Sequence, residues 1–534
     1  LRIASARLRN RSRWTVQYLV DRLRDETRRL GELSSGERSV AATIQLSYQA
    51  MEEEHRRAFR LLGLHPGTEV DVHSGAALLG TDRREAEDIL ERLLDVHLVQ
   101  QHTLGQYALH DLVHRLCAKL RTRSCSFAQS LCTQAARAAD EAAVERVLDY
   151  YVAASERACT VLFPRRARHT APAPVGEAEL PPLDCVEQAR GWFDQEHAAL
   201  LSAVTVAHEQ GLDLQTGQLA RNAMFYLNLR GAFDEYEHIA VLAVASARRL
   251  GDPAALRTGL SNLTSAHWKL GKFRHGLKSA EEALEIARSV GDTHGQAVSL
   301  DQLGLLHSCL GDLTEGRENL VRSIELHENP MRKEMALCNL STVCAWLGRY
   351  EEAAAAAEQA VELRRSEGEP VSGIPALNDL AIALLGLGEP ERAKDCLGQA
   401  MSVGDESSVP EDLALTLALA ADAEQRLGRQ RSASAYAERA LDLVRERGTA
   451  LRCCDVENIV GRMHRQRGAH AQALELHRSA ADRAGAIEYR VELARAHDGM
   501  AQAASALGDG ASARRHRARA DELFTSMEMP EGAR

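Results

Sequence analysis

Large aromatic side chains are scarce: Phe, Trp and Tyr make up 4% of the 534 residues, too few for a core built on rings. No apolar run approaches the ~18 residues that a membrane-spanning helix needs, and no segment has the pattern of a secretory signal peptide. The eleven cysteines include no C-x-x-C pair. Neither a metal site nor a disulfide framework is therefore predicted, and a reducing cytoplasm is the expected compartment.

Lysine is also rare, with six residues against an excess of arginine, a bias typical of GC-rich, actinobacterial-like genomes. The formal net charge of −11 argues against a surface that binds nucleic acid in general.

Motifs for catalysis are missing as well. No G-x-x-x-x-G-K-[ST] phosphate loop is present, and the one Gly-Lys pair, Gly271-Lys272, is followed by Phe273. The chain order suggests no Ser-His-Asp or Cys-His arrangement. We therefore expect no catalytic residue, no metal and no cofactor of this chain's own, and we do not expect it to be an enzyme.

A ladder of eight glycines dominates the last two thirds of the sequence. Successive members are 40 residues apart, with one step of 37, and several follow a leucine, as in Leu270-Gly271 and Leu347-Gly348. The ladder consists of Gly231, Gly271, Gly311, Gly348, Gly388, Gly428, Gly468 and Gly508. A fixed period of this length indicates a solenoid with one supersecondary unit per repeat.

A small residue stands twelve positions after each ladder glycine: Ala243, Ala283, Ser323, Ala360, Ala400, Ala440, Ala480 and Ala520. Glycine permits a tight turn between two helices, and a small residue lets the second helix pack closely on the first. The pattern resembles the tetratricopeptide repeat in a 40-residue form. The predicted fold is mainly all-α, an α-solenoid of eight hairpins that wind into a superhelix over residues 184–525, before a short tail at 526–534.

The region before the array divides into three parts. Residues 1–35 are predicted as a helical piece, 36–120 as a compact winged-helix domain, and 121–183 as a helical linker with a Pro-rich connector. Within the compact domain the pattern predicts helices at 38–50, 52–64, 70–79, 82–96 and 110–120, with a two-stranded wing at 98–100 and 107–109.

A winged helix raises the alternative of a DNA-binding transcription factor. The helix that would enter the major groove, 82–96, carries more carboxylates than arginines. Such a helix would repel phosphates, which favours protein docking over DNA binding.

Several segments resemble the back end of the NB-ARC module of signal-transduction ATPases (the STAND class). They are Leu1-Arg2-Ile3-Ala4, Leu46-Ser47-Tyr48, the run from Phe59 to Pro66, and Tyr107-Ala108-Leu109-His110-Asp111-Leu112. Linker segments such as Val147-Leu148-Asp149-Tyr150-Tyr151 and Gly191-Trp192-Phe193-Asp194-Gln195-Glu196 are similar to those of AfsR-like bacterial regulators. The resemblance extends over essentially the whole chain.

The resemblance implies a nucleotide-sensing role for His110 and Asp111, which match the family's Met-His-Asp motif with Leu109 in place of methionine. In the family this histidine reaches the ADP diphosphate. The alternative is that both residues only cap a helix. His110 and His114 also have the i, i+4 spacing of a zinc helix, but no third ligand is indicated, so no metal is expected.

Nine residues before the first five ladder glycines stand polar residues, and then Leu419, Ile459 and Gly499 follow. Related long-repeat arrays use asparagines at such a register to bind the backbone of an extended peptide, since an amide both donates and accepts hydrogen bonds. The alternative is ordinary solvated polar residues. The peptide-groove candidates are Asn222, Asn262, Gln302, Asn339 and Asp379.

Together these patterns predict the regulatory and sensor half of a bacterial STAND-type protein in transcription regulation. The array would bind a protein or peptide, and the winged helix would relay the signal to the protein's own upstream nucleotide-binding domain. The resemblance implies ADP or ATP binding only in a longer protein, oligomers that form on ligand binding, no membrane contact, and DNA binding only through a domain outside this chain. Leu1 lies in mid-pattern, so we expect the sequence to be a fragment.

Overall fold

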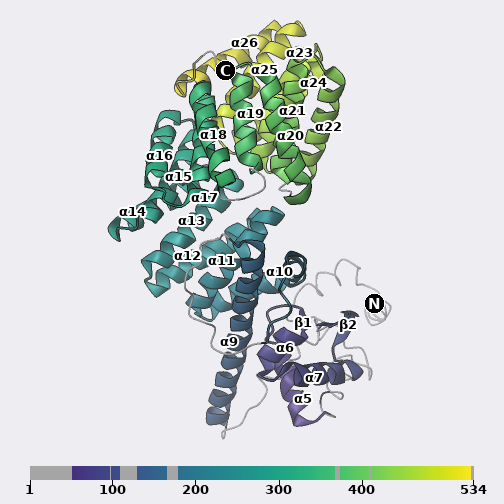
Figure 1. The fold of residues 1–534 in the computed structure, drawn as a ribbon. Coiled ribbons are helices and arrows are strands. Elements are labelled where there is room, and N and C mark those ends of the chain that lie inside the picture. Colours follow the sequence, from purple (N-terminus) through teal and green to yellow (C-terminus); the bar gives the residue numbers. More distant parts are fainter. Residues whose placement is uncertain are drawn as a thin grey trace, which may run out of the picture. The chain divides into compact units, whose positions relative to one another are not determined.

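The computed structural model describes residue 48 and residues 51–96, 98–108, 129–164, 179–366, 373–407 and 410–530. It forms two compact units, Leu1–Phe225 and Tyr226–Arg534. Figure 1 shows their elements, which are helical except for three short strands in the described part of the first unit.

The first unit opens with a small domain of helices and strands. Its elements are α5 (Glu53–Leu62), β1 (Glu69–Asp71), α6 (Val72–Leu79), α7 (Arg83–Asp95), β2 (Gln100–Thr103) and β3 (Gln106–Ala108). The strands form an antiparallel sheet in the order β1-β3-β2. Its core consists of fully or nearly fully buried side chains: Phe59, Leu62, Leu78, Leu90, Leu93, Leu98 and Tyr107.

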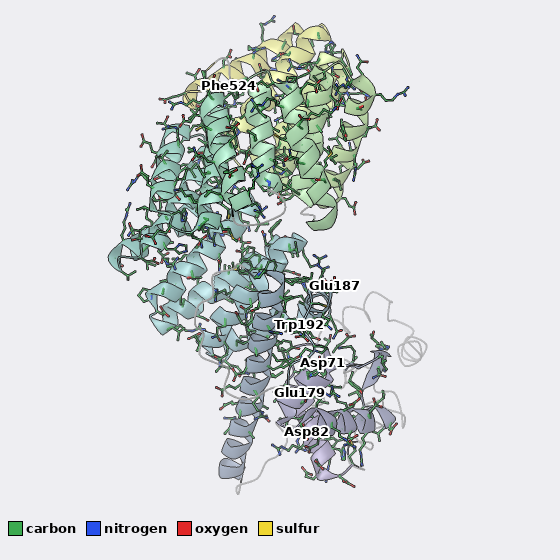
Figure 2. The ribbon with its side chains drawn as sticks, viewed as in Figure 1. Asp71, Asp82, Glu179, Glu187, Trp192 and Phe524 are labelled. Carbon is green, nitrogen blue, oxygen red and sulfur yellow. The ribbon has the colours of Figure 1, made fainter. Side chains whose placement is uncertain are left out.

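Strand β1 corrects the predicted helix at 70–79. Val70 pairs with Tyr107 of β3, and the helix starts only after Asp71, whose carboxylate accepts a hydrogen bond of 2.6 Å from the Ser74 N–H. Asp82 caps α7 in the same way (Figure 2). A three-residue strand is too short to show an alternating pattern, so the sequence did not reveal it. The predicted helices at 38–50, apart from residue 48, and at 110–120 lie outside the described residues.

Two long helices follow in this unit, α9 (Gln129–Leu162) and α10 (Val186–Glu209). Arg146 of α9 donates to the carbonyls of Ala77 and Leu78 in the last turn of α6, which attaches α9 to the small domain. Helix α10 precedes the first glycine turn as a helix of its own. We expected the repeats to begin at residue 184. The first ladder glycine, Gly231, lies between α11 (Asp213–Arg230) and α12 (Phe233–Leu250), so these two helices form the first hairpin.

The second unit continues as a regular series of helical hairpins. After α12 the helices are α13 (Pro253–Lys269), α14 (Phe273–Ser289), α15 (Thr293–Cys309), α16 (Leu313–Leu326), α17 (Pro330–Trp346), α18 (Tyr350–Ser366), α19 (Ile374–Gly386), α20 (Pro390–Ser407), α21 (Pro410–Arg426), α22 (Gln430–Arg447), α23 (Ala450–Gln466), α24 (His470–Ala486), α25 (Arg490–Ala506) and α26 (Gly510–Ser526). The prediction of a mostly helical repeat solenoid is confirmed.

The ladder glycines make the turns. All eight have a positive φ, from 69° to 98°, in the left-handed region that glycine adopts without strain. At Gly271 the N–H bonds to the Trp268 carbonyl, and the next N–H, of Lys272, bonds to the His267 carbonyl. This pair of bonds is the Schellman end of a helix, and it satisfies carbonyls that would otherwise lack partners.

The small residues lie in the core of the array, where the Ser323 hydroxyl donates to the Ala297 carbonyl on the first helix of its own hairpin over 2.8 Å. All eight are buried, and seven of them have no exposed surface. Each first helix also contacts the first helix of the next hairpin, from α13 with α15 to α23 with α25. The first helices therefore form a continuous layer. Within the part of the chain that the structure describes, no helix is both long and apolar enough to cross a membrane.

We predict that Ala360→Leu destabilises the second unit. Ala360 is fully buried on α18, so a larger side chain would separate the helices and cost roughly 1–3 kcal/mol. Thermal melts and urea titrations would measure the loss. Ala355→Leu, at an exposed alanine of the same helix, is the matched control and should change stability little. Equal stability of both variants would contradict the proposed close contact.

Candidate functional site

The predicted polar column lies on the layer of first helices, and most of its members bond to a neighbouring repeat. Gln302 of α15 donates to the Ser261 carbonyl (2.8 Å) and to the Ser265 hydroxyl (3.1 Å), both on α13. Asn339 of α17 donates to Asp301 of α15 over 2.9 Å. These side chains thus link successive first helices.

Asp379 continues this series on α19, where its carboxylate accepts a 2.9 Å hydrogen bond from the Thr342 hydroxyl of α17. Burial is the main cause of a raised pKa at two carboxyls of the series: Asp379 rises to about 7, although Thr342 opposes the shift, and Asp301 rises to about 6. The acidic members are therefore poised to lose a proton close to neutral pH.

Asn222 is the exception among the five candidates. It is 2% exposed, and its amide donates to the Ser155 hydroxyl of α9 over 2.9 Å, inside the first unit. Its role is to join α11 to α9. Asn222 was grouped with the other four candidates because it has the same position relative to a ladder glycine. Nothing in the sequence indicates that α9 covers α11.

Two members of the column keep unused hydrogen-bonding capacity. The Asn262 side chain is half-buried on α13 and has no hydrogen bond within the described part of the chain. The Oε1 atom of Gln302 is buried and has no partner among the described residues. An N–H group presented to this part of the layer could satisfy the Gln302 oxygen, and Asn262 could both donate and accept.

Beyond α19 some of the links between first helices are ion pairs. Arg452 of α23 pairs with Asp412 of α21 over 3.1 Å, and Arg462 pairs with Asp422 over 3.0 Å. Both pairs consist of residues 40 positions apart. The sequence analysis missed these pairs because it compared only the position nine residues before each ladder glycine, where Leu419 and Ile459 are apolar. The same 40-residue comparison at other registers would have found them.

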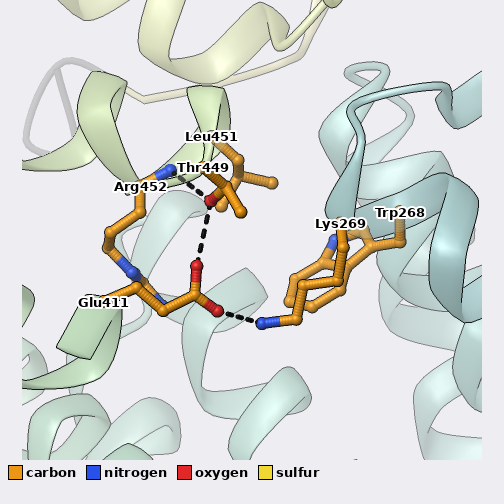
Figure 3. Close-up of a pocket in the computed structure, with 6 residues that line it drawn as sticks. All are labelled: Trp268, Lys269, Glu411, Thr449, Leu451 and Arg452. Carbon is orange, nitrogen blue, oxygen red and sulfur yellow. Dashed lines mark hydrogen bonds and ion pairs between the residues drawn. The ribbon is translucent and has the colours of Figure 1, made fainter. Parts of the chain in front are cut away.

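Lys269 and Glu411 connect first helices that are far apart in the sequence. Lys269 ends α13 and forms an ion pair with Glu411 near the start of α21 (Figure 3). Burial opposes ionisation of Glu411, but the charges of Lys269 and Arg452 outweigh it and lower the pKa of this carboxyl. Because helices four hairpins apart face each other here, the layer of first helices is the inner wall of the array.

The space around this ion pair is closed. It is lined by Trp268, Lys269, Glu411, Thr449, Leu451 and Arg452, and the gap between them is too small for a water molecule (Figure 3). Thr449 donates to Glu411 over 3.1 Å, so the carboxylate is held from both sides of the array. The ion pair thus joins the two walls at this point.

A buried polar cluster lies within the first unit. The Tyr151 hydroxyl of α9 donates to Glu196 of α10 over 2.8 Å and lies 3.3 Å from Nε2 of His65, which follows α5. Burial, followed by the charge of Asp71, raises the pKa of Glu196 to about 7. The cluster joins the small domain to both long helices, beside the ring of Trp192 (Figure 2).

The remaining predicted site residues, His110 and Asp111, lie outside the described residues. Helix α7 exposes the carboxylates of Glu85, Glu87, Asp88 and Asp95 together with three arginines. Among the described residues, no group of three or more His, Cys, Asp or Glu side chains could hold a metal ion.

Comparison with known proteins supports the resemblance stated from the sequence. The profile of the tetratricopeptide repeat family matches residues 333–406, from the first turn of α17 through α18 and α19 into the last turn of α20. The regulatory protein AfsR of Streptomyces griseus is 29% identical over 468 residues, which are 86% of this chain and 46% of AfsR. This chain is similar to AfsR regulatory proteins over most of its length. AfsR of Streptomyces coelicolor is likewise 29% identical, over 67% of this chain and 36% of its own.

The chain thus spans less than half the length of the curated relatives it matches. Among solved structures, a STAND protein with a tetratricopeptide repeat sensor from Pyrococcus horikoshii aligns with 83% of this chain and 72% of its own, at 14% identity and a TM-score of 0.34.

We predict that Asp379→Asn changes how stability depends on pH. Because the folded pKa is raised to about 7, the stability linked to this carboxyl is fully present below about pH 4 and is lost as the pH rises through 7. The variant, compared with the natural chain, should therefore gain on the order of 1–4 kcal/mol between pH 4 and pH 8.

Urea titrations at the two pH values would measure this difference. Asp442→Asn, at a carboxylate that is 77% exposed, is the control and should show none. An identical pH dependence for Asp379→Asn and the natural chain would show that Asp379 ionises normally.

Proposed function

We propose that this chain is the sensor half of an AfsR-like STAND regulator, whose repeat array binds a protein or peptide. The observation that carries the proposal is the similarity to AfsR regulatory proteins over 86% of the chain. An array of tetratricopeptide repeats fits a binding role, because its inner wall presents repeated side chains at a regular spacing.

The preferred ligand is an extended peptide bound along α13 and α15. Asn262 and Gln302 are adjacent members of the column, on successive first helices, and both have free capacity for hydrogen bonds. Amide side chains recognise the peptide backbone whatever its side chains are. Asn339 and Asp379 could join them by exchanging their present partners on the neighbouring helices.

The small domain would relay the signal as a winged helix. Its order of helix, strand, two helices and two strands, with β1 paired to β3, fits that fold. The buried contacts of Tyr151 with Glu196 and His65 favour joint movement of this domain and the two long helices. A movement of the two long helices would thereby reach the small domain.

Nucleotide chemistry belongs, in this proposal, to a domain outside the chain. The chain itself would neither bind ADP or ATP alone nor catalyse hydrolysis, because it has no phosphate loop. His110 and Asp111 would contact the nucleotide that the upstream domain holds. DNA binding and the control of transcription would likewise depend on a separate domain.

A selection from a library of displayed peptides against the full chain tests the binding role. We predict that the triple variant Asn262→Ala, Gln302→Ala, Asn339→Ala loses the selected peptides. Each lost hydrogen bond should weaken binding by roughly 0.5–1.5 kcal/mol, which amounts to one to three decades of affinity for all three. A thermal melt must show that the variant is folded.

The matched control is a triple replacement of exposed residues on second helices: Glu281→Ala, Glu318→Ala and Gln359→Ala. Normal binding by the column variant would place the ligand elsewhere. A library that yields no specific peptide would argue against peptide recognition.

In a longer protein that includes the nucleotide domain, we predict that His110→Ala weakens ADP binding and raises basal output. The reason is the loss of an imidazole that contacts the diphosphate and favours the resting state. Nucleotide affinity and reporter output would be measured with His114→Ala as the control. Unchanged values for His110→Ala would leave it only a capping role.

A further inference from the structure

A second series of turns, those that follow the second helix of a hairpin, ends in two exceptional residues. Gly251 and Gly291 adopt positive φ in these turns, with values of 64° and 68°. At the same 40-residue register, the last turns carry Glu488 and Glu528, with φ of 58° and 56°. They are the only non-glycine residues with positive φ in the part of the chain that the structure describes.

Glutamate at such a position strains the backbone, which glycine would not. Where a protein keeps a non-glycine residue in such a strained backbone conformation, we infer that the side chain makes a contact that glycine could not make. Glu488 accepts three hydrogen bonds of 2.6–2.9 Å from the Arg274 guanidinium. Glu528 accepts one of 3.4 Å from the Thr314 hydroxyl.

The two contacts are copies of each other. Arg274 and Thr314 each stand three positions after a ladder glycine, and each lies 214 residues before its glutamate. Since a repeat has 40 residues, the array returns to its own early turns after about 5.4 repeats. We name the two contacts together the clasp.

Apolar side chains pack beneath both parts of the clasp. A Cβ atom on Gly271 would lie 2.6 Å from Ile487, and one on Gly311 would lie 3.0 Å from Met527. By contrast, a Cβ atom on four later ladder glycines, Gly388, Gly428, Gly468 and Gly508, would meet nothing within 4 Å. Gly271 and Gly311 thus serve both as turns and as docking surfaces for the end of the array.

Tyr489 strengthens the first contact. Its ring packs edge-on against Phe273 and Trp346, with centroids 6.1 and 5.9 Å away. Its hydroxyl donates to Asp455 of α23 over 3.3 Å. The turn that bears Glu488 is therefore connected directly to the charged inner wall.

We propose that the clasp is a releasable latch that holds the array closed, and that it must open before a ligand reaches the inner wall. The proposal rests on the proposed function, in which that wall binds the ligand. Closure is seen directly at Lys269, which is only 18% exposed and bridges the walls to Glu411. The outer ion pair suits release, because Arg274 and Glu488 are 66% and 49% exposed and water can replace either partner.

Amine labelling of the full chain, read by mass spectrometry, tests this without a ligand. The chain has six lysines, so each can be followed separately. The probe is acetic anhydride. We expect Glu488→Arg and Arg274→Glu each to raise the labelling rate of Lys269 at least five-fold, and the double charge reversal to restore its protection. Lys394, which is 41% exposed, serves as the internal reference.

Arg248→Glu is the matched control. Arg248 and Glu282 form a bidentate pair with similar exposure, 55% and 39%, but they join neighbouring repeats. This variant should leave Lys269 protected. Unchanged labelling of Lys269 in both clasp variants would overturn the proposal, and so would a double reversal that fails to restore protection.

The variant Glu488→Gly distinguishes a latch from a contact that only stabilises the fold. Glycine removes the strain of the turn as well as the ion pair, so the thermal midpoint should stay within a few degrees while Lys269 labelling still rises. Small-angle X-ray scattering should show a larger radius of gyration. Unaltered labelling and radius would refute the latch, whereas a peptide library that yields nothing would refute only the proposed ligand.

Discussion

In every repeat the chain reverses at a left-handed glycine, and two N–H groups of the turn bond back to carbonyls of the first helix. This closed turn fixes how the second helix leaves the first, and the buried small residue twelve positions later fixes how closely they pack. Since the same two constraints recur in every repeat, small rotations add up along the array. These accumulated rotations determine which helices form the inner wall and bring the turns at Glu488 and Glu528 to the early turns of the array.

The hairpins could be predicted because their determinants are local and periodic. Within one repeat, Gly348 predicts the turn and Ala360, twelve residues later, predicts the close packing of the second helix. Closure at Glu488 could not be predicted, since it depends on a rotation accumulated over more than five repeats and on a partner 214 residues away. Asn222 was wrongly predicted to face a ligand. Its position in the repeat was identified correctly, but that position does not reveal that α9 covers it. Strand β1 was missed because three residues carry too little pattern.

The inner wall is less open than the sequence suggested. A column of polar side chains was expected to face a ligand, yet Asn339 and Asp379 bond to the preceding first helix. Arg452 and Asp412 likewise link neighbouring first helices, with full charges. Such links stabilise the layer and also leave polar groups that can exchange partners. Free capacity is concentrated at Asn262 and Gln302, so recognition, as proposed, would start near the beginning of the array.

The repeated spacing of the clasp limits how the array can evolve. Open solenoids gain and lose whole repeats readily, since every unit touches only its neighbours. Here a duplication between Gly311 and Ile487 would carry Glu488 and Glu528 past Arg274 and Thr314 by a whole unit, and both contacts would be lost together. The number of repeats in that interval is therefore a fixed dimension of the molecule, as the circumference of a closed barrel is.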